Sequence, residues 1–143
     1  LQDEGLGVRA VEALRARLSA DAHVQLMDGG TLGLDLLPYL EGVTHLLVLD
    51  AVHARQEPGT LVRLEGGAIQ ASLAVKMSMH QVGLQELLAA ATFQGALPAQ
   101  VVLLGLQPAS LDWGTELTPT VQAALEGLVI AAEGQLRAWG MLV

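Results

Sequence analysis

The stretch Leu46-Leu47-Val48-Leu49-Asp50 decides the fold, because four consecutive apolar residues are followed at once by a carboxylate. An apolar run without alternating polar residues is typical of a parallel strand that helices cover on both faces. Asp50 then marks the carboxyl end of this strand. A carboxylate beside a core costs free energy unless it is paired or ligated, so we expect Asp50 to have a working role.

Three further segments are predicted to form strands. Residues 101–106 are apolar throughout and end at Gln107-Pro108, which makes them the other candidate central strand. Residues 60–64 alternate moderately after a turn at Pro58-Gly59, a pattern that favours an antiparallel or edge strand. Residues 23–28 lead into a pair of glycines and read as a short strand before a tight turn.

Apolar residues at helical spacing predict the helices between these strands. One is expected from about Gly7 to Leu18, one from Thr31 through Tyr39, one just after His80, and a long closing helix that starts at Thr118-Pro119. This order predicts an α/β fold: a three-layer α/β/α sandwich with a mostly parallel twisted sheet, forming a single domain over residues 1–143. Because the chain opens on a helix start, a first strand is expected to be missing before it.

The composition excludes several classes of protein. With 52% hydrophobic residues the chain can bury a core, but only 3% are aromatic, so Leu, Val and Ala must fill it. A net charge of -8 leaves no basic face for nucleic acid. No apolar run reaches the roughly 18 residues needed to span a bilayer, and there is no cysteine for a disulfide or a thiolate site. These features predict a cytoplasmic protein.

Four residues that could carry chemistry map to the carboxyl edge of the predicted sheet, where ligands collect in open α/β folds: Glu4, Asp28, Asp50 and His80. A histidine at a helix amino terminus tends to stay neutral, because the helix dipole disfavours its protonated form. Two carboxylates and one imidazole suit nickel or zinc better than magnesium. Three of these residues also have a structural interpretation, whereas Asp50 after four apolar residues is harder to explain in that way. Glu4 could complement a helix dipole, Asp28 could form a turn, and His80 could cap a helix.

Other active-site patterns fit less well. Gly5-Leu6-Gly7 is too short for a dinucleotide fingerprint, and the chain has neither a Walker loop nor a zinc-protease His-Glu-x-x-His motif. A triad of Ser78, His80 and Asp50 is conceivable, but the strained elbow that presents a nucleophilic serine is absent from the sequence.

Five stretches, in this order along almost the whole chain, resemble the endopeptidases that mature nickel-iron hydrogenases. They are Asp3-Glu4-Gly5-Leu6-Gly7, Asp28-Gly29-Gly30-Thr31-Leu32-Gly33, the strand end at Asp50, His80-Gln81-Val82-Gly83-Leu84, and Gly105 to Leu111 with Leu117-Thr118-Pro119.

The resemblance implies that Glu4, Asp50 and His80 contact the metal, and that Asp28 lies near the cleavage region. Asp28 and Asp50 are the candidate catalytic carboxylates. The implied substrate is the carboxyl-terminal extension of a hydrogenase large-subunit precursor, removed after nickel insertion. Nickel would be presented by the precursor, and another divalent ion could bind adventitiously. The family also has a strand that ends in a Gly-x-Gly-Asn turn before the first helix, which this chain lacks.

We hypothesise that the nickel orients the scissile peptide and that a metal-polarised or carboxylate-activated water attacks it. Two alternatives remain. The chain could be a metal-dependent hydrolase of the same fold that acts on another protein, or a non-catalytic assembly or metallochaperone module. Shortening of the precursor would separate the catalytic alternatives from the binding one.

Overall fold

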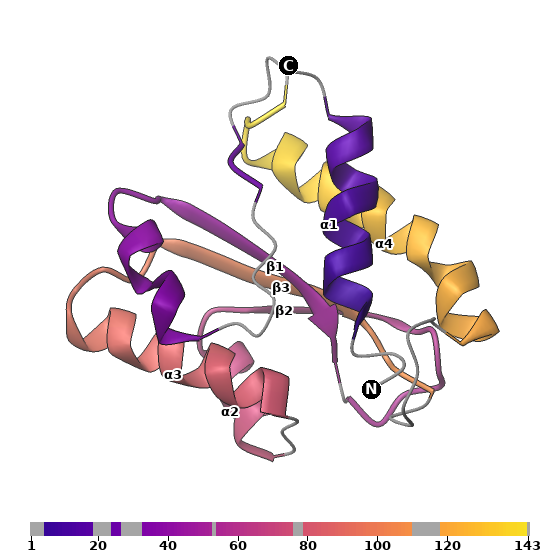
Figure 1. Cartoon of the computed structure of the whole chain (residues 1–143), viewed down its shortest axis with the longest axis horizontal. Helices are drawn as coiled ribbons and strands as arrows, with labels where there is room; N and C mark the ends of the chain where they lie inside the picture. The colour runs from indigo at the N-terminus through magenta and orange to yellow at the C-terminus, as the bar shows by residue number, and fades with distance from the viewer. Residues whose placement is uncertain are drawn as a thin grey trace. The chain divides into compact units, whose positions relative to one another are not determined.

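The computed structural model describes residues 5–18, 24–26, 33–52, 54–75, 79–109 and 118–142. Figure 1 shows the helices and strands along the chain. In order they are α1 (Leu6–Arg17), the 3-10 helix η2 (Leu34–Leu40), β1 (His45–Ala51), β2 (Leu61–Glu65), α2 (Gly67–Val75), α3 (Met79–Phe93), β3 (Gln100–Leu106) and α4 (Pro119–Ala138).

The three described strands form one sheet in the order β1-β3-β2. β3 therefore lies in the middle, and all its residues after Gln100 are buried, which confirms the predicted central strand at 101–106. β1 and β3 run parallel. Gln100 N donates to Thr44 O at 3.1 Å at one end, and Val52 N donates to Leu106 O at 3.0 Å at the other. This parallel pair brings the carboxyl ends of β1 and β3 to the same edge.

β2 pairs with β3 in the opposite direction. Gln107 N donates to Thr60 O at 2.9 Å, while Gly66 N donates to Val101 O at 3.1 Å, so the residue numbers run against each other. Exposed and half-buried residues alternate along β2, as expected for a strand with one sheet neighbour. The predicted edge strand is confirmed, and the described sheet is mixed: one of its two pairings is parallel.

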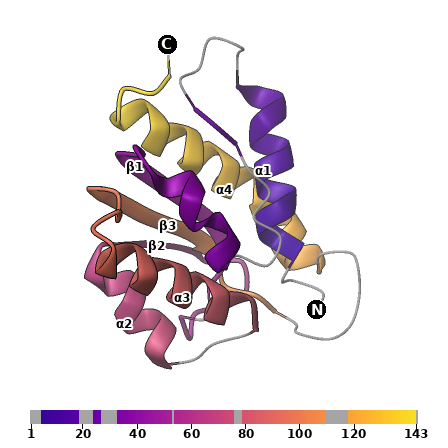
Figure 2. The same ribbon diagram turned by 60° about the vertical axis from the view of Figure 1, so that its left-hand side comes forward.

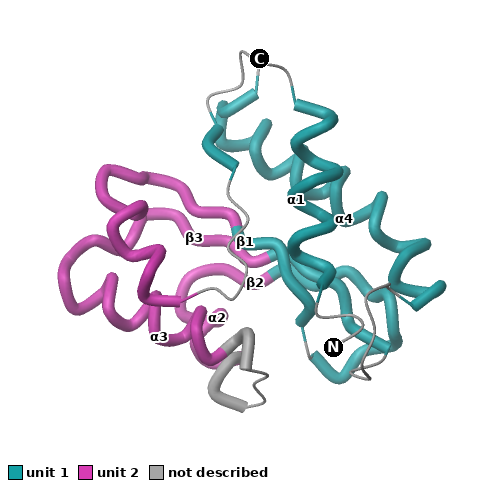
Figure 3. Tube along the Cα trace, viewed as in Figure 1, with its two compact units in different colours: residues 1–28, 48–63, 104–143 teal, residues 29–47, 64–103 magenta. Residues whose placement is uncertain are grey.

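The chain divides into two compact units, coloured separately in Figure 3. Unit 1 contains residues 1–28, 48–63 and 104–143, and unit 2 contains residues 29–47 and 64–103. The strands run from one unit into the other. A single domain over 1–143 stays a prediction.

In unit 1, α1 packs against α4, and the two helices lie side by side in Figures 1 and 2. α1 buries Leu6, Gly7, Ala10 and Leu14, which repeat at one-turn spacing. The long amphipathic helix predicted at the end of the chain is confirmed as α4, with Pro119 in its first turn as expected. Arg17 of α1 and Glu133 of α4 form an ion pair across this contact.

In unit 2, α3 packs against both η2 and α2. Leu40, Leu87 and Ala91 form a buried cluster there, against which three partly buried leucines pack: Leu36, Leu37 and Leu46. The helix α2 was not predicted. A helix was expected through Tyr39, but the structure has a 3-10 helix there, with Pro38 inside it. Proline has no N–H to donate and clashes with the preceding turn of an α-helix, which favours the shorter form.

One predicted strand lies partly outside the described residues. Residues 24–26 do not form a strand, and the rest of the 23–28 segment lies outside the described residues. The helix expected just after His80 begins one residue before it, at Met79. No helix in the described part of the chain is long and apolar enough to cross a membrane.

Candidate functional site

Asp50 is the next-to-last residue of β1 and only 1% exposed. Within the described residues it is the only buried polar or charged side chain. Its Oδ1 accepts a hydrogen bond from the backbone N–H of Ala51 at 2.8 Å. A carboxylate this deeply buried requires compensating interactions, because it has lost its hydration. The burial sets Asp50 apart from the other acidic residues that the structure describes.

The amino end of α1 lies against the backbone just before Asp50. A Cβ atom added to Gly7 would lie 2.5 Å from Leu49 O and 3.7 Å from Asp50 Cα. Real side chains do not approach a backbone oxygen so closely, so this contact requires glycine at position 7. It also places the amino end of α1, which is the positive end of the helix dipole, near Asp50.

A second glycine lies against Asp50 from β3. A Cβ atom on Gly105 would collide with the backbone oxygen of Asp50 and with a methyl group of Val52. Gly105 thus allows the central strand to approach the carboxyl end of β1 closely. The backbone around Asp50 is therefore enclosed by two glycine contacts, one from a helix and one from a strand.

The other predicted site residues are described only in part. Glu4 and Asp28 lie outside the described residues. His80 is the second residue of α3, whereas the sequence predicted that the helix begins just after it, and its side chain is outside the described part. No group of three His, Cys, Asp or Glu side chains that could hold a metal occurs among the described residues. The proposed ligand set Glu4, Asp50 and His80 therefore stays a prediction.

Sequence reasoning missed the role of Gln107, the residue directly after β3. Its side-chain Oε1 accepts hydrogen bonds from the backbone N–H of Ala54 at 2.7 Å and of Gln56 at 3.2 Å. Arg55, between these two donors, has a positive φ of 57°. The signal that could have revealed Gln107 is a polar residue that ends an apolar run, the same signal that pointed to Asp50.

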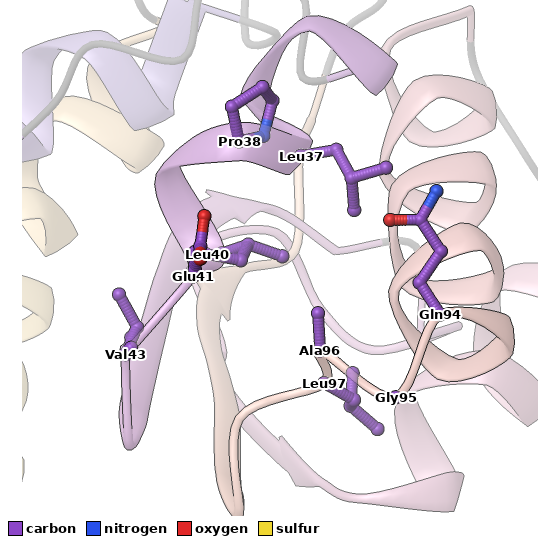
Figure 4. A pocket seen from close by; sticks show the side chains of 10 residues that line it. Leu37, Pro38, Leu40, Glu41, Val43, Gln94, Gly95, Ala96 and Leu97 are labelled. Atoms are coloured by element: carbon purple, nitrogen blue, oxygen red, sulfur yellow. The ribbon is translucent and has the colours of Figure 1, made fainter.

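A pocket of about 530 Å³ lies within unit 2 (Figure 4). Residues 37–43, apart from Tyr39, line one part of it, and residues 94–97 line the other. In Figure 4 the side chains of Leu37, Leu40 and Gln94 are seen around it. These segments precede β1 and β3, whereas Asp50 comes near the end of β1. Asp50 is not among the lining residues.

Comparison with known proteins gives a consistent result. A family model described as hydrogenase maturation protease matches residues 8–135. The chain is 43% identical over 143 residues to the hydrogenase expression/formation protein HupD of Rhodobacter capsulatus, covering 99% of this chain and 68% of that protein. It is 38% identical to the hydrogenase 2 maturation protease of Escherichia coli, covering 99% and 87%. The solved structure of the hydrogenase maturating endopeptidase HybD from E. coli superposes with a TM-score of 0.91 at 38% identity, covering 98% of this chain and 87% of that one.

Proposed function

Because this chain belongs to the hydrogenase maturation protease family, we propose that Asp50 is the central carboxylate of its peptide-cleaving site. The chain is an endopeptidase of hydrogenase maturation, and it processes the carboxyl terminus of the large subunit. The observation that supports a role for Asp50 is its burial at the carboxyl end of β1, where α1 and β3 both approach through glycines. Aspartate is among the residues least often fully buried in proteins, so burial of this degree indicates a specific role.

The substrate in this proposal is a large-subunit precursor that already carries nickel, and the residues cut away are its carboxyl-terminal extension. Glu4, Asp50 and His80 would contact the nickel of the precursor. Two carboxylates and an imidazole match the ligand preferences of a borderline divalent ion, so the residue types fit. Glu4 precedes Gly7 by three residues, and Gly7 contacts the backbone beside Asp50, which supports placing Glu4 near Asp50. His80 is in the first turn of α3, at the amino end of that helix.

The chain's own carboxylates supply the acid-base chemistry. Asp50 or Asp28 accepts a proton from the attacking water as its oxygen bonds to the scissile carbonyl carbon. The proton then passes to the leaving amine, so that both products are formed without any further reactant. The precursor is held through its nickel, which places the scissile bond beside these carboxylates and removes the entropic cost of bringing them together. The assignment to an aspartyl type of peptidase belongs to this proposal.

The finer predictions on fold and location belong to the same proposal. A three-layer α/β/α sandwich forming one domain is supported by the similarity to HybD over 98% of this chain. The strand expected before the first helix stays a prediction. So do the cytoplasmic location, which cell fractionation would test, and the absence of nucleic acid among its partners.

The proposal is tested by incubating purified protein with precursor that was prepared with and without nickel, and by following the precursor mass. We expect shortening of the nickel-loaded precursor only. A His80→Ala variant should lose this nickel-dependent cleavage. Equal cleavage of both precursors, or normal cleavage by the His80→Ala variant, would contradict the nickel-recognition part of the proposal. Binding without shortening would favour the non-catalytic assembly module instead.

A further inference from the structure

Near Asp50, at the carboxyl edge of the sheet, Gln107 is hydrogen-bonded to the loop after β1. Gln107 N donates to Thr60 O at 2.9 Å, and Gln107 O accepts from Gly59 N at 2.8 Å. The backbone of Gln107 is thereby fixed to the segment before β2. Its side chain then reaches the loop after β1, so one residue joins three parts of unit 1 at this edge.

Two backbone N–H groups of this loop bind the side-chain oxygen of Gln107. The N–H groups of Ala54 and Gln56 converge on one oxygen atom because Arg55, between them, adopts a left-handed conformation. Successive N–H groups arranged in this way form a small concave site for an electron-rich atom. For a residue with a Cβ the left-handed conformation costs folding free energy. A non-glycine residue at this position therefore requires either stabilising interactions that offset the cost or a function of its side chain. The two hydrogen bonds to Gln107 supply compensation, but they would form equally well with glycine at position 55.

The side chain of Arg55 therefore needs a separate explanation. It is exposed, and no other Lys or Arg occurs between Arg17 and Arg63 in a chain of net charge -8. It follows Asp50 by five residues. Between them, Val52 is hydrogen-bonded to Leu106, the residue before Gln107, so the loop begins at the carboxyl edge of β1 and β3. An exposed guanidinium on an acidic protein, held on a constrained loop beside the candidate site, is suited to bind a carboxylate in two-point contact.

We propose that Arg55 is a specificity-determining residue of the cleavage reaction: its guanidinium binds a carboxylate of the carboxyl-terminal extension, and Gln107 is the positioning residue that fixes its loop. This inference rests on the proposed function, which requires the extension to lie beside Asp50. An extension that ends the precursor chain always has a terminal carboxylate, and it can also have acidic side chains. Both present the same chemistry to Arg55.

The first test measures kcat and KM for cleavage of nickel-loaded precursor by Arg55→Ala, Arg55→Lys and the wild type. Loss of a hydrogen-bonded charge should raise KM about tenfold in Arg55→Ala and leave kcat within about twofold. The KM of Arg55→Lys should lie between those of the wild type and Arg55→Ala, because lysine keeps the positive charge but lacks the planar guanidinium. Arg137→Ala, which removes an exposed arginine near the end of α4, is the matched control and should leave both constants unchanged. An unchanged KM for Arg55→Ala, or a loss confined to kcat, overturns the inference.

The second test separates the side chain from the loop conformation. Arg55→Gly removes the guanidinium but relieves the left-handed strain, so it should melt at a higher temperature than Arg55→Ala while showing the same raised KM. Gln107→Leu should raise KM as Arg55→Ala does. Gln107→Glu, which keeps an acceptor for both N–H groups, should have a KM close to that of the wild type. In the double variant Gln107→Leu/Arg55→Ala, KM should rise no further than in Arg55→Ala alone. Fully additive effects would show that Gln107 has only a structural role.

The third test identifies the carboxylate. One precursor has an amidated terminus, and another has the acidic side chains of its extension replaced by amides. The carboxylate that binds Arg55 is the one whose removal raises KM for the wild type and not for Arg55→Ala. If neither substrate changes KM, the inference is overturned. If the wild type fails to cleave any nickel-loaded precursor, the proposed function itself fails, and this result is distinct from all the others.

Discussion

Replacing Gly7 by alanine would insert a methyl group into the contact between α1 and β1. The added carbon would lie 2.5 Å from Leu49 O and 3.5 Å from the Leu49 carbonyl carbon. A tolerable C···O separation is about 3.3 Å, so α1 and β1 would have to move apart by about 0.8 Å at this point. The obstacle is a backbone oxygen of a strand, which cannot rotate away as a side chain can.

The magnitude follows from two opposing terms. Overpacking of this kind costs about 2–3 kcal/mol when the neighbour is rigid. Alanine in place of glycine inside a helix stabilises the folded state by about 1 kcal/mol, because its helix propensity is higher. We therefore expect Gly7→Ala to lower the free energy of unfolding by about 1–2 kcal/mol, or Tm by about 3–8 °C. Since the displaced backbone continues into Asp50, the cleavage rate should fall by about tenfold to a hundredfold.

The assay combines thermal unfolding, followed by circular dichroism, with cleavage of nickel-loaded precursor. Gly134→Ala is the matched control, because it is also a helical glycine but has no atom within 4 Å of an added Cβ. This variant should be more stable than the wild type by about 1 kcal/mol and should cleave normally. A Gly7→Ala variant that melts at or above the wild-type temperature and cleaves at the normal rate would refute the close-approach explanation.

Further predictions concern the second glycine contact and the core. Gly105→Ala should lower both the melting temperature and the cleavage rate, because the added methyl group would collide with the backbone oxygen of Asp50; normal values of both would contradict this. Leu128→Ala should cost about 2–5 kcal/mol in chemical denaturation, because Leu128 is fully buried in α4. Ile130→Ala on the same helix should cost about 0.5 kcal/mol or less, because Ile130 is 53% exposed. Equal losses from the last two variants would contradict the buried position of Leu128 and the exposed position of Ile130.

The sequence predicted the fold best where a segment's own residues determine its secondary structure. The apolar run at 101–106 was a candidate central strand, and it is the middle strand of the described sheet. The alternation at 60–64 predicted the edge strand for the same local reason. In contrast, α2 was missed because Gly67–Val75 has no charged residue and hence no clear polar face to indicate a helix.

The candidate site could be predicted only in part, because its geometry depends on residues far apart in the chain. The apolar run before Asp50 correctly indicated a buried carboxylate. The sequence motifs included Gly7 and Gly105, but the reason for each glycine is a tertiary contact with the Asp50 segment, which no local pattern shows. The role of Gln107 likewise depends on a loop about fifty residues earlier in the chain.

The most direct test of the central role of Asp50 is the mass of nickel-loaded large-subunit precursor after incubation with Asp50→Asn. This substitution keeps the size of the side chain and removes its charge. Asp35→Asn, at an exposed position in η2, is the matched control. We predict that the wild type and Asp35→Asn shorten the precursor at similar rates, while with Asp50→Asn its mass stays unchanged although the variant remains folded. Shortening by Asp50→Asn at the wild-type rate would contradict the account.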